Sequence, residues 1–145
     1  MPRLIAPGSY EASAVIRAAP TEVWTVLADI AAWPTWDSGV TRVRGRLAPD
    51  AKVRLTVDGL GNGYPFKVTE LVAGERIVLT GRTPLGVFTG VRTYTLAASG
   101  GSTTFTVREE YSGRFAKAVL TTMPDLTASF RRFADGLKRR VEDER

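Results

Sequence analysis

The sequence has 145 residues, of which 43% are hydrophobic, and this is enough for a single domain over residues 1–145 with a core and room for a cavity. It contains no cysteine and no histidine, so disulfides, thiolate metal sites, histidine-based triads and the commonest metal ligand are excluded, and we expect no metal and no cofactor. The formal net charge is +5, but the basic residues are spread along the chain, so we attribute most of them to solvated faces and expect no nucleic-acid partner.

The first ten residues contain one arginine and no apolar run long enough for a signal peptide. No later segment approaches the length of a membrane span. We therefore predict a cytoplasmic protein that does not insert stably into membranes.

A strand and two short helices are expected next along the chain. Residues 10–17 alternate in polarity, which predicts a strand with one better buried face. Pro20 is favoured at the first helical position, and the following apolar side chains predict a helix from residue 20 to about residue 29. Residues 31–36 predict a second short helical turn, which Pro34 breaks.

Tryptophans are concentrated in these two helical segments, with Trp24 in the first and Trp33 and Trp36 in the second. Trp33 and Trp36 stand too close to the ends of their turn to form an ordinary core stripe. They either plug the end of the core or line the mouth of a pocket. The sequence leaves both alternatives open.

After Gly39 the apolar period becomes two and predicts six successive strands, at residues 40–47, 52–57, 64–72, 76–83, 87–97 and 102–112. Short links rich in glycine and proline join them, so neighbouring strands must be antiparallel. One face carries the apolar rows Val53, Leu55 and Val57, Tyr64, Phe66 and Val68, Ile77 and Leu79, Tyr94 and Leu96, and Phe105 and Val107. A helix must cover that face.

Residues 124–142 are the one long segment with an unbroken helical period, and they supply that helix. At a rise of about 1.5 Å per residue it spans roughly 28 Å, about the width of a small domain. Because Pro124 cannot donate a backbone hydrogen bond, the helical stretch that begins near Phe115 should break close to Thr122 and Met123. Residues 115–122 would then form a lid that exchanges amide hydrogens faster than the final helix.

Two segments imitate functional motifs. Residues 59–63 resemble a phosphate-binding glycine loop, but they join two strands and carry no lysine, so we interpret them as a flexible hairpin. Residues 138–140 are basic, but cations suit the last turn of a helix, and no aromatic side chains are interleaved with them for base stacking.

The order of these elements resembles the START-like (SRPBCC) helix-grip superfamily, and specifically its polyketide cyclase/dehydratase and lipid-transport family. The segments that carry the resemblance are residues 19–24 with Asp29, 33–36, 109–113 and 137–142. The resemblance implies an α+β fold in which a curved antiparallel seven-stranded sheet wraps around a long C-terminal helix, with a hydrophobic cavity between them. Its members include sterol and lipid carriers, hormone receptors, aromatase/cyclases and co-chaperone-like domains, so the fold alone does not choose a function.

A cavity is also indicated by the residues themselves. Gly81 and Gly90 fall on inward rows where a filled core would need bulk, although the alternative is that the aromatic side chains fill the space completely. The ligand-binding candidates are Trp24, Trp36, Tyr64, Phe66, Phe88, Arg92, Tyr94, Phe105, Glu109, Met123 and Phe130.

The turn at Gly100 and Gly101 predicts the register of the last hairpin. It sets Arg92 opposite Glu109, and the period of two carries both side chains inward. The pair is either structural, or the guanidinium holds a carboxylate, phenol or enolate of a ligand while Glu109, with Tyr94 and Tyr111 nearby, takes or gives a proton. Arg92, Glu109 and Tyr94 are the catalytic candidates in that second case.

Three functions follow. The first is binding or transport of a hydrophobic small molecule, either lipid-like or polyketide-like, by a monomer or weak homodimer. The second is a cyclase, aromatase or dehydratase, which would need acid/base groups that converge in the cavity. The third is a co-chaperone-like interaction domain, which would need a broad apolar patch on its outside.

Overall fold

The structure, a computed structural model, describes residues 8–83, 85, 87–121 and 124–143. The strands are β1 (Ser9–Ile16), β2 (Val40–Gly45), β3 (Lys52–Val57), β4 (Tyr64–Val72), β5 (Arg76–Arg82), β6 (Thr89–Ser99) and β7 (Ser102–Ser112). The described helices are α1 (Pro20–Ala28), the 3-10 helix η1 (Ile30–Thr35), α2 (Ala116–Leu120) and α3 (Thr127–Asp143). None of these helices is both long and apolar enough to cross a membrane.

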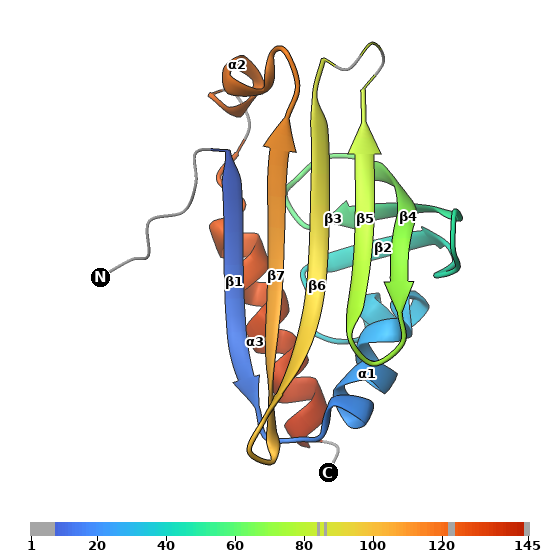
Figure 1. Cartoon of the computed structure of the whole chain (residues 1–145), viewed down its shortest axis with the longest axis vertical. Helices are drawn as coiled ribbons and strands as arrows, with labels where there is room; N and C mark the ends of the chain where they lie inside the picture. The colour runs from blue at the N-terminus through green and yellow to red at the C-terminus, as the bar shows by residue number, and fades with distance from the viewer. Residues whose placement is uncertain (1–7, 84, 86, 122–123, 144–145) are drawn as a thin grey trace.

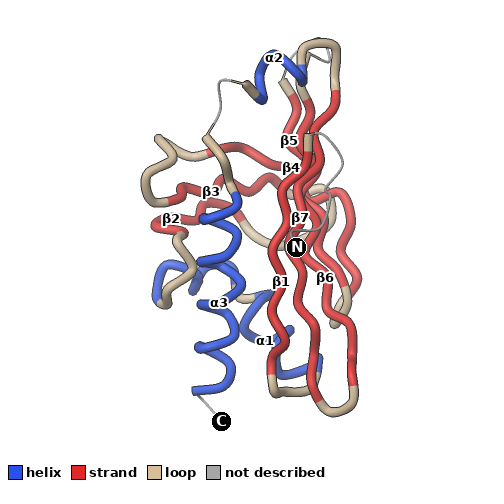
Figure 2. The backbone as a smooth tube through the Cα atoms, turned by 90° about the vertical axis from the view of Figure 1, so that its left-hand side faces the viewer, coloured by secondary structure: helices blue, strands red, loops and turns tan. Residues whose placement is uncertain are grey.

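The seven strands form one antiparallel sheet in the order β1-β7-β6-β5-β4-β3-β2. The sheet curls, so that β2 and β3 leave the plane of β1, β7 and β6 and α3 lies inside the curl (Figures 1 and 2). The α1 and η1 helices follow the first strand; α1 packs beside the lower part of α3, and η1 packs on β2 with Trp33 and Trp36 against Phe133 of α3. The α+β helix-grip fold predicted from the sequence is therefore confirmed.

The hairpin between β6 and β7 has the predicted register. Gly100 and Gly101 both have positive φ, 54° and 87°, which glycine adopts without strain. This turn places Ser99 opposite Ser102 and sets Arg92 opposite Glu109. The inward row of each strand thus passes from apolar residues near the turn to charged residues further along.

The long helix begins three residues later than predicted. The Asp125 carboxylate accepts a hydrogen bond from the Thr127 backbone N–H, 2.8 Å away, and so satisfies one of the free donors at the start of α3. Pro124 lies before the helix. The predicted break at Thr122 and Met123 lies outside the described residues, but the flanking helices α2 and α3 are separate elements, as expected.

Pro34 does not break the second helical turn, and the prediction was wrong on this point. It lies inside η1, because the fixed φ of proline is close to the φ of a 3-10 helix. The Trp36 backbone N–H then donates to the Trp33 carbonyl at 3.4 Å and closes the helix.

Four aromatic side chains fill the centre of the core, and we call Trp33, Tyr94, Phe105 and Phe133 the aromatic cluster. The Phe133 ring lies 4.9 Å from that of Trp33, 5.6 Å from that of Tyr94 and 5.8 Å from that of Phe105. The Trp33 indole N–H donates to the Leu27 carbonyl at 3.0 Å, so its one polar atom is satisfied. Trp33 therefore plugs the core, which was one of the two alternatives from the sequence.

Candidate functional site

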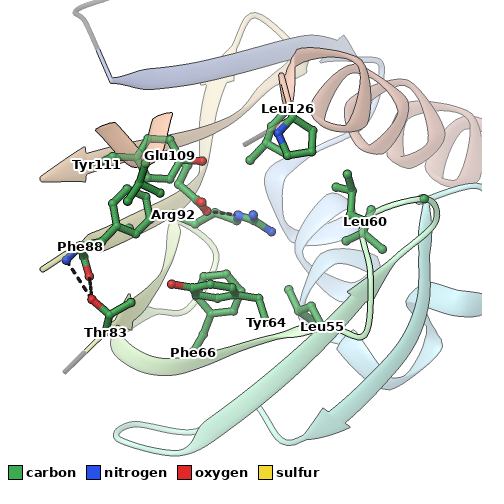
Figure 3. A pocket seen from close by; sticks show the side chains of 16 residues that line it. Leu55, Leu60, Tyr64, Phe66, Thr83, Phe88, Arg92, Glu109, Tyr111 and Leu126 are labelled. Carbon is green, nitrogen blue, oxygen red and sulfur yellow. Dashed lines mark hydrogen bonds and ion pairs between the residues drawn. The ribbon is translucent and has the colours of Figure 1, made fainter. Parts of the chain in front are cut away.

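Beyond the aromatic cluster, the space between the sheet and the start of α3 contains a pocket of about 470 Å³ (Figure 3). Its walls come from β3, β4 and the turn between them, from the β5–β6 connection, from β6 and β7, and from α2 and the residues just before α3. The lining residues are Leu55, Val57, Gly59, Leu60, Gly63, Tyr64, Phe66, Thr83, Phe88, Gly90, Arg92, Glu109, Tyr111, Val119, Pro124 and Leu126. Most of this wall is apolar.

Two glycines that face inward, Gly81 and Gly90, leave space that neighbouring aromatic rings occupy. A Cβ at Gly81 would lie 2.3 Å from Cε1 of Tyr64, so only glycine at this position admits the tyrosine ring. A Cβ at Gly90 would lie 3.3 Å from the Tyr111 ring and 3.4 Å from a Glu109 oxygen, and Gly90 itself lines the pocket. The predicted inward positions of both glycines are confirmed, and one of them keeps space open.

Arg92 and Glu109 meet at the pocket wall as the register predicts. Nε of Arg92 donates to Oε2 of Glu109 at 2.5 Å, and the two side chains are only 12% and 6% exposed. The guanidinium carbon lies 5.0 Å from the ring centroids of both Phe66 and Phe130. A buried pair held this way has its charges compensated and its position fixed.

The surroundings keep Arg92 charged and the neighbouring phenols neutral. Burial alone would lower the pKa of Arg92, but the charge of Glu109 and contacts with Tyr94 outweigh it, and the pKa is raised. Burial, with the charge of Glu109, raises the pKa of Tyr111 and of Tyr64 above the ordinary value, and burial also raises the pKa of Tyr94. These tyrosines are therefore O–H donors at neutral pH.

Tyr111 has a free hydrogen-bonding group beside the pocket. Its hydroxyl oxygen is buried close to the Glu109 carboxylate, and burial together with that charge raises the pKa of the phenol, but the hydroxyl forms no hydrogen bond of good geometry with a described residue. The ring stacks on Phe88 with centroids 5.3 Å apart, which fixes its direction. An unsatisfied buried hydroxyl costs free energy, so an acceptor that reached it would be stabilised.

The predicted ligand-binding residues fall into four groups. Tyr64, Phe66, Phe88, Arg92 and Glu109 line the pocket together. Tyr94 and Phe105 belong to the aromatic cluster, and Phe130 packs against the Arg92 guanidinium. Trp24 and Trp36 are partly buried against the core and are not part of the pocket wall, and the buried Trp36 indole nitrogen has no described partner. Met123 lies outside the described residues.

Several wall residues were not among the predicted ligand-binding residues. Tyr111 was expected only as a neighbour of Glu109, although it continues the inward row of Phe105, Val107 and Glu109 and the period of two therefore places it on the pocket side. Leu60 lies in the glycine-rich turn that we interpreted only as a flexible hairpin. Nothing in the local sequence indicates that its side chain turns inward.

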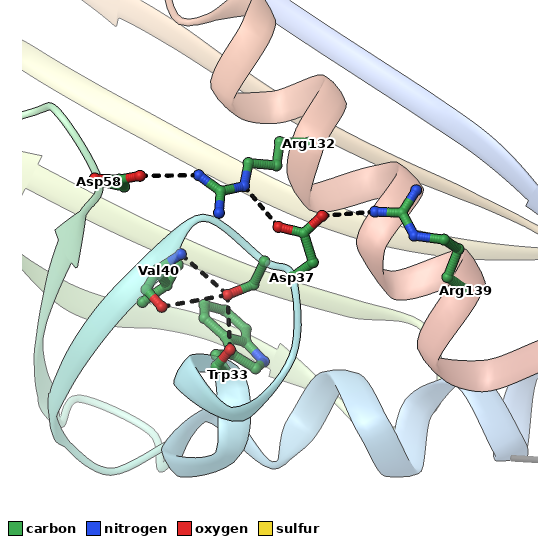
Figure 4. A network of polar contacts seen from close by, with 7 residues as sticks. Trp33, Asp37, Val40, Asp58, Arg132 and Arg139 are labelled. Carbon is green, nitrogen blue, oxygen red and sulfur yellow. Dashed lines mark hydrogen bonds and ion pairs between the residues drawn. The ribbon is translucent and has the colours of Figure 1, made fainter. Parts of the chain in front are cut away.

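A polar network outside the pocket holds the long helix to the sheet (Figure 4). Arg132 donates to Asp37 at 2.7 Å and to Asp58 at 3.2 Å, and Arg139 donates to the other oxygen of Asp37 at 2.7 Å. Asp58 directly precedes the turn that carries Leu60. The network therefore ties the helix to the segment that forms one wall of the pocket.

The groups at the pocket allow hydrogen bonding and proton exchange. Arg92 supplies a fixed positive charge, Glu109 a carboxylate and Tyr111 a neutral donor. Among the described residues, no three histidine, cysteine, aspartate or glutamate side chains are grouped so that they could hold a metal ion.

Several solved structures have the same fold. The Zhui aromatase/cyclase from Streptomyces sp. R1128 is 14% identical with a TM-score of 0.71, and the match covers 94% of each chain. A norcoclaurine synthase from Thalictrum flavum is 14% identical with a TM-score of 0.72, again over 94% of each chain. An Aha1 dimer from Colwellia psychrerythraea is 14% identical with a TM-score of 0.69, and the match covers 92% of this chain and 96% of that one.

These identities are low, so the solved structures show the fold alone. A comparison with curated protein sequences finds no match. The family model described as "Polyketide cyclase / dehydrase and lipid transport" matches residues 7–142, which is nearly the whole sequence. The chain therefore belongs to the polyketide cyclase/dehydrase and lipid transport family.

Proposed function

We propose that the chain binds a hydrophobic small molecule, lipid-like or polyketide-like, in the pocket between the sheet and α3. The observation that carries this proposal is the mostly apolar pocket of about 470 Å³, which lies beside the buried core. A volume of this size lies within the range of about 300–1,000 Å³ usual for small-molecule sites. Its two charged side chains, Arg92 and Glu109, lie together and have Tyr111 beside them, which suits a ligand with one polar end.

A second candidate is a cyclase, aromatase or dehydratase. It is favoured by the titratable side chains that line the same wall, Glu109 as a proton acceptor and Tyr111 as a donor. Both groups reach the pocket, so a substrate carbonyl could lie between them. Turnover of a poly-ketone substrate that Glu109→Gln abolishes, while binding persists, would distinguish the enzyme from the carrier.

The interaction domain is less well supported. The large apolar side chains that the described residues expose are Val15, Tyr64, Leu85 and Phe115, and they do not form one broad patch.

A cytoplasmic location and a monomeric or weakly dimeric state stay predictions from the sequence. Size-exclusion chromatography with light scattering tests the second of these.

Binding is tested with a neutral apolar probe, N-phenyl-1-naphthylamine, whose fluorescence rises in apolar surroundings. We expect saturable one-to-one binding, which Val57→Trp abolishes because the indole would fill the pocket. Val15→Trp is the matched control, since Val15 is exposed on β1 outside the pocket. A folded protein that binds no such probe, or equal binding by both variants, would contradict the proposal.

The predicted lid is tested in the same samples. None of the side chains of α2 is buried, whereas α3 buries Phe130, Phe133 and Leu137, so amides of α2 should exchange faster. Val119 of α2 lines the pocket, so the bound probe should slow exchange there. Equal exchange in both helices, with and without probe, would exclude a lid.

A further inference from the structure

The polar end of the pocket suggests which ligands it accepts, and this inference rests on the proposed binding function. We infer that the pocket takes an uncharged ligand whose polar end is a carbonyl or hydroxyl group, and that it rejects carboxylates. Three residues, Arg92, Glu109 and Tyr111, carry the inference, and we call them the polar corner.

The cation of the polar corner is already paired. Nε of Arg92 donates to the Glu109 carboxylate at 2.5 Å, and the guanidinium lies against the rings of Phe66 and Phe130. A ligand carboxylate would be a second anion next to a single cation, and the Arg92 and Glu109 side chains are only 12% and 6% exposed. Such an arrangement of like charges is strongly unfavourable.

No other charge at the pocket could compensate a ligand anion. Apart from Arg92 and Glu109, the titratable residues of the described pocket wall are Tyr64 and Tyr111. Burial raises the pKa of both phenols, so both stay neutral. The wall as a whole is therefore electrically balanced before a ligand enters.

The polar corner offers one free donor and one anionic acceptor. The buried Tyr111 hydroxyl forms no hydrogen bond of good geometry with a described residue, and a ligand carbonyl or hydroxyl oxygen would satisfy it. The second carboxylate oxygen of Glu109, Oε1, lies near Gly90 at the pocket wall and can accept from a ligand hydroxyl. A ketone uses the first of these groups, and an alcohol or phenol can use both.

A series of eleven-carbon compounds tests the inference by displacement of N-phenyl-1-naphthylamine at about pH 8, where a carboxylic acid is ionised. We expect undecan-2-one and undecan-1-ol to displace the probe at concentrations roughly tenfold or more below those of undecanoate. Tyr111→Phe should weaken the affinity for the ketone by roughly threefold to tenfold, while the affinity for undecane stays the same. Glu109→Gln should raise the affinity for undecanoate, because Arg92 then has no carboxylate partner in the protein.

The outcomes separate two failures. If no probe binds the wild-type protein, the proposed function fails, and this inference fails with it. If the probe binds but undecanoate displaces it as well as the ketone does, only the selectivity is wrong. Because Glu109→Gln removes one partner of a buried pair and can prevent folding, the wild-type series and Tyr111→Phe decide the question without it.

A separate observation concerns the end of the sheet where both α2 and the β5–β6 connection lie (Figure 1). Leu85 is 92% exposed and Phe115 is 51% exposed. The Phe115 backbone N–H donates to the Val87 carbonyl at 3.1 Å, which joins the two segments. We call Arg82, Leu85, Arg114, Phe115 and Lys117 the tip.

The charges of the tip all have one sign. Residues 81–91 and 111–121 contain no aspartate or glutamate, and their only charged residues are Arg82, Arg114 and Lys117. No ion pair joins any of these three to a described residue. Glu110, the acid nearest in sequence, is paired with Arg108 at 3.2 Å.

We propose that the tip docks reversibly on an anionic bilayer surface. Exposed apolar side chains that enter the headgroup region, together with cations that attract anionic lipids, are what such docking requires. Thr83, Phe88 and Val119 of the pocket wall adjoin the tip in sequence, so a docked protein would hold its pocket near the bilayer.

Sedimentation with vesicles tests this proposal, with phosphatidylcholine alone or with about 30% phosphatidylglycerol. We expect binding to the anionic vesicles only, weakened by salt and lost in the double variant Leu85→Asp, Phe115→Asp. Val15→Asp is the matched control, because Val15 is 56% exposed but lies on β1 outside the tip, and it should bind like wild type.

Two results would overturn the docking proposal. The first is binding to anionic vesicles that the double variant retains. The second is that the wild-type protein binds no vesicles. If light scattering then shows self-association that the double variant abolishes, the tip contacts a second copy of the protein instead.

Discussion

The hairpin of β6 and β7 passes through two differently built regions. Near its turn, Tyr94 and Phe105 pack with Trp33 and Phe133 into the aromatic cluster, and little space is left. Further along the same inward rows, Gly90 and the Arg92–Glu109 pair face the pocket. One pair of strands therefore contributes to both a closed core and an open site.

The difference arises from what covers the sheet in each region. The middle of α3 covers the cluster, and a Cβ at Gly136 would lie 1.9 Å from the Asp37 carbonyl oxygen, so the helix approaches the η1–β2 link closely. Over the pocket, the cover is the short α2 and the residues just before α3, and α2 buries no side chain. Stability and binding should therefore respond to different substitutions.

The largest effect is expected in the aromatic cluster. Phe133→Ala removes a ring that contacts Trp33, Tyr94 and Phe105, and should lower the free energy of unfolding by about 3–5 kcal/mol. Phe88→Ala, beside the pocket, should cost less than about 3 kcal/mol, because that ring already borders open space. Urea unfolding measures both, and equal losses would remove the distinction between the two regions.

The ion pair at the boundary should behave as a unit. Arg92→Met and Glu109→Gln should each cost about 3–5 kcal/mol, because each leaves a buried charge unpaired, and the double variant should cost less than their sum. The same cycle is measured for probe affinity. Coupling in stability alone leaves a purely structural pair, and additive losses in both measurements would show that the side chains do not interact.

The pairing of Arg92 with Glu109 was predictable from the sequence because a local turn determines it. Gly100 and Gly101 specify a tight turn, and the period of two then carries the register to Arg92 and Glu109. The same alternation along β7 predicts that Tyr111, two residues after Glu109, also faces inward. These inferences need only the residues of one hairpin.

The rest of the pocket depends on contacts between distant segments. The apolar period shows which side chains of a strand face inward, but not which of them the helix covers. The sequence therefore could not place Leu126 at the pocket wall and Phe105 in the core. Trp24 and Trp36 had suitable chemistry, but their direction depends on how α1 and η1 pack. Leu60 turns inward from a loop that has no period at all.

A smaller effect is expected where α3 meets the η1–β2 link. Gly→Ala inside a helix is normally stabilising by about 1 kcal/mol, but Gly136→Ala should destabilise by about 1–3 kcal/mol, because the new methyl group meets the Asp37 carbonyl. Ala128→Ser on the exposed side of α3 is the control and should change stability little. A stabilised Gly136→Ala variant would show that the close approach is absent.

The smallest effect is expected in the exposed network around Asp37. A hydrogen bond from Arg132 and the charges of Arg132 and Arg139 lower the pKa of this carboxyl. Since the folded-state pKa is the lower one, the stabilisation is present above the ordinary value of 3.8 and is lost as the pH falls through the lowered value. In Asp37→Asn, the free energy of unfolding should therefore change less with pH in this acid range than in the wild-type protein.

High salt provides the control for the network, because exposed ion pairs are screened. At about 1 M salt, wild type and Asp37→Asn should unfold at nearly the same pH. A difference that persists in high salt would mean that the network is not electrostatic in origin.

The most direct test of the proposed function is an amide chemical-shift map of the labelled protein with saturating N-phenyl-1-naphthylamine. The account predicts that the largest changes fall on pocket residues such as Leu55, Phe66 and Tyr111, and that Trp33 and Phe133 of the aromatic cluster change little. Largest changes within the cluster or on the outer face of the sheet, or no changes at all, would contradict it.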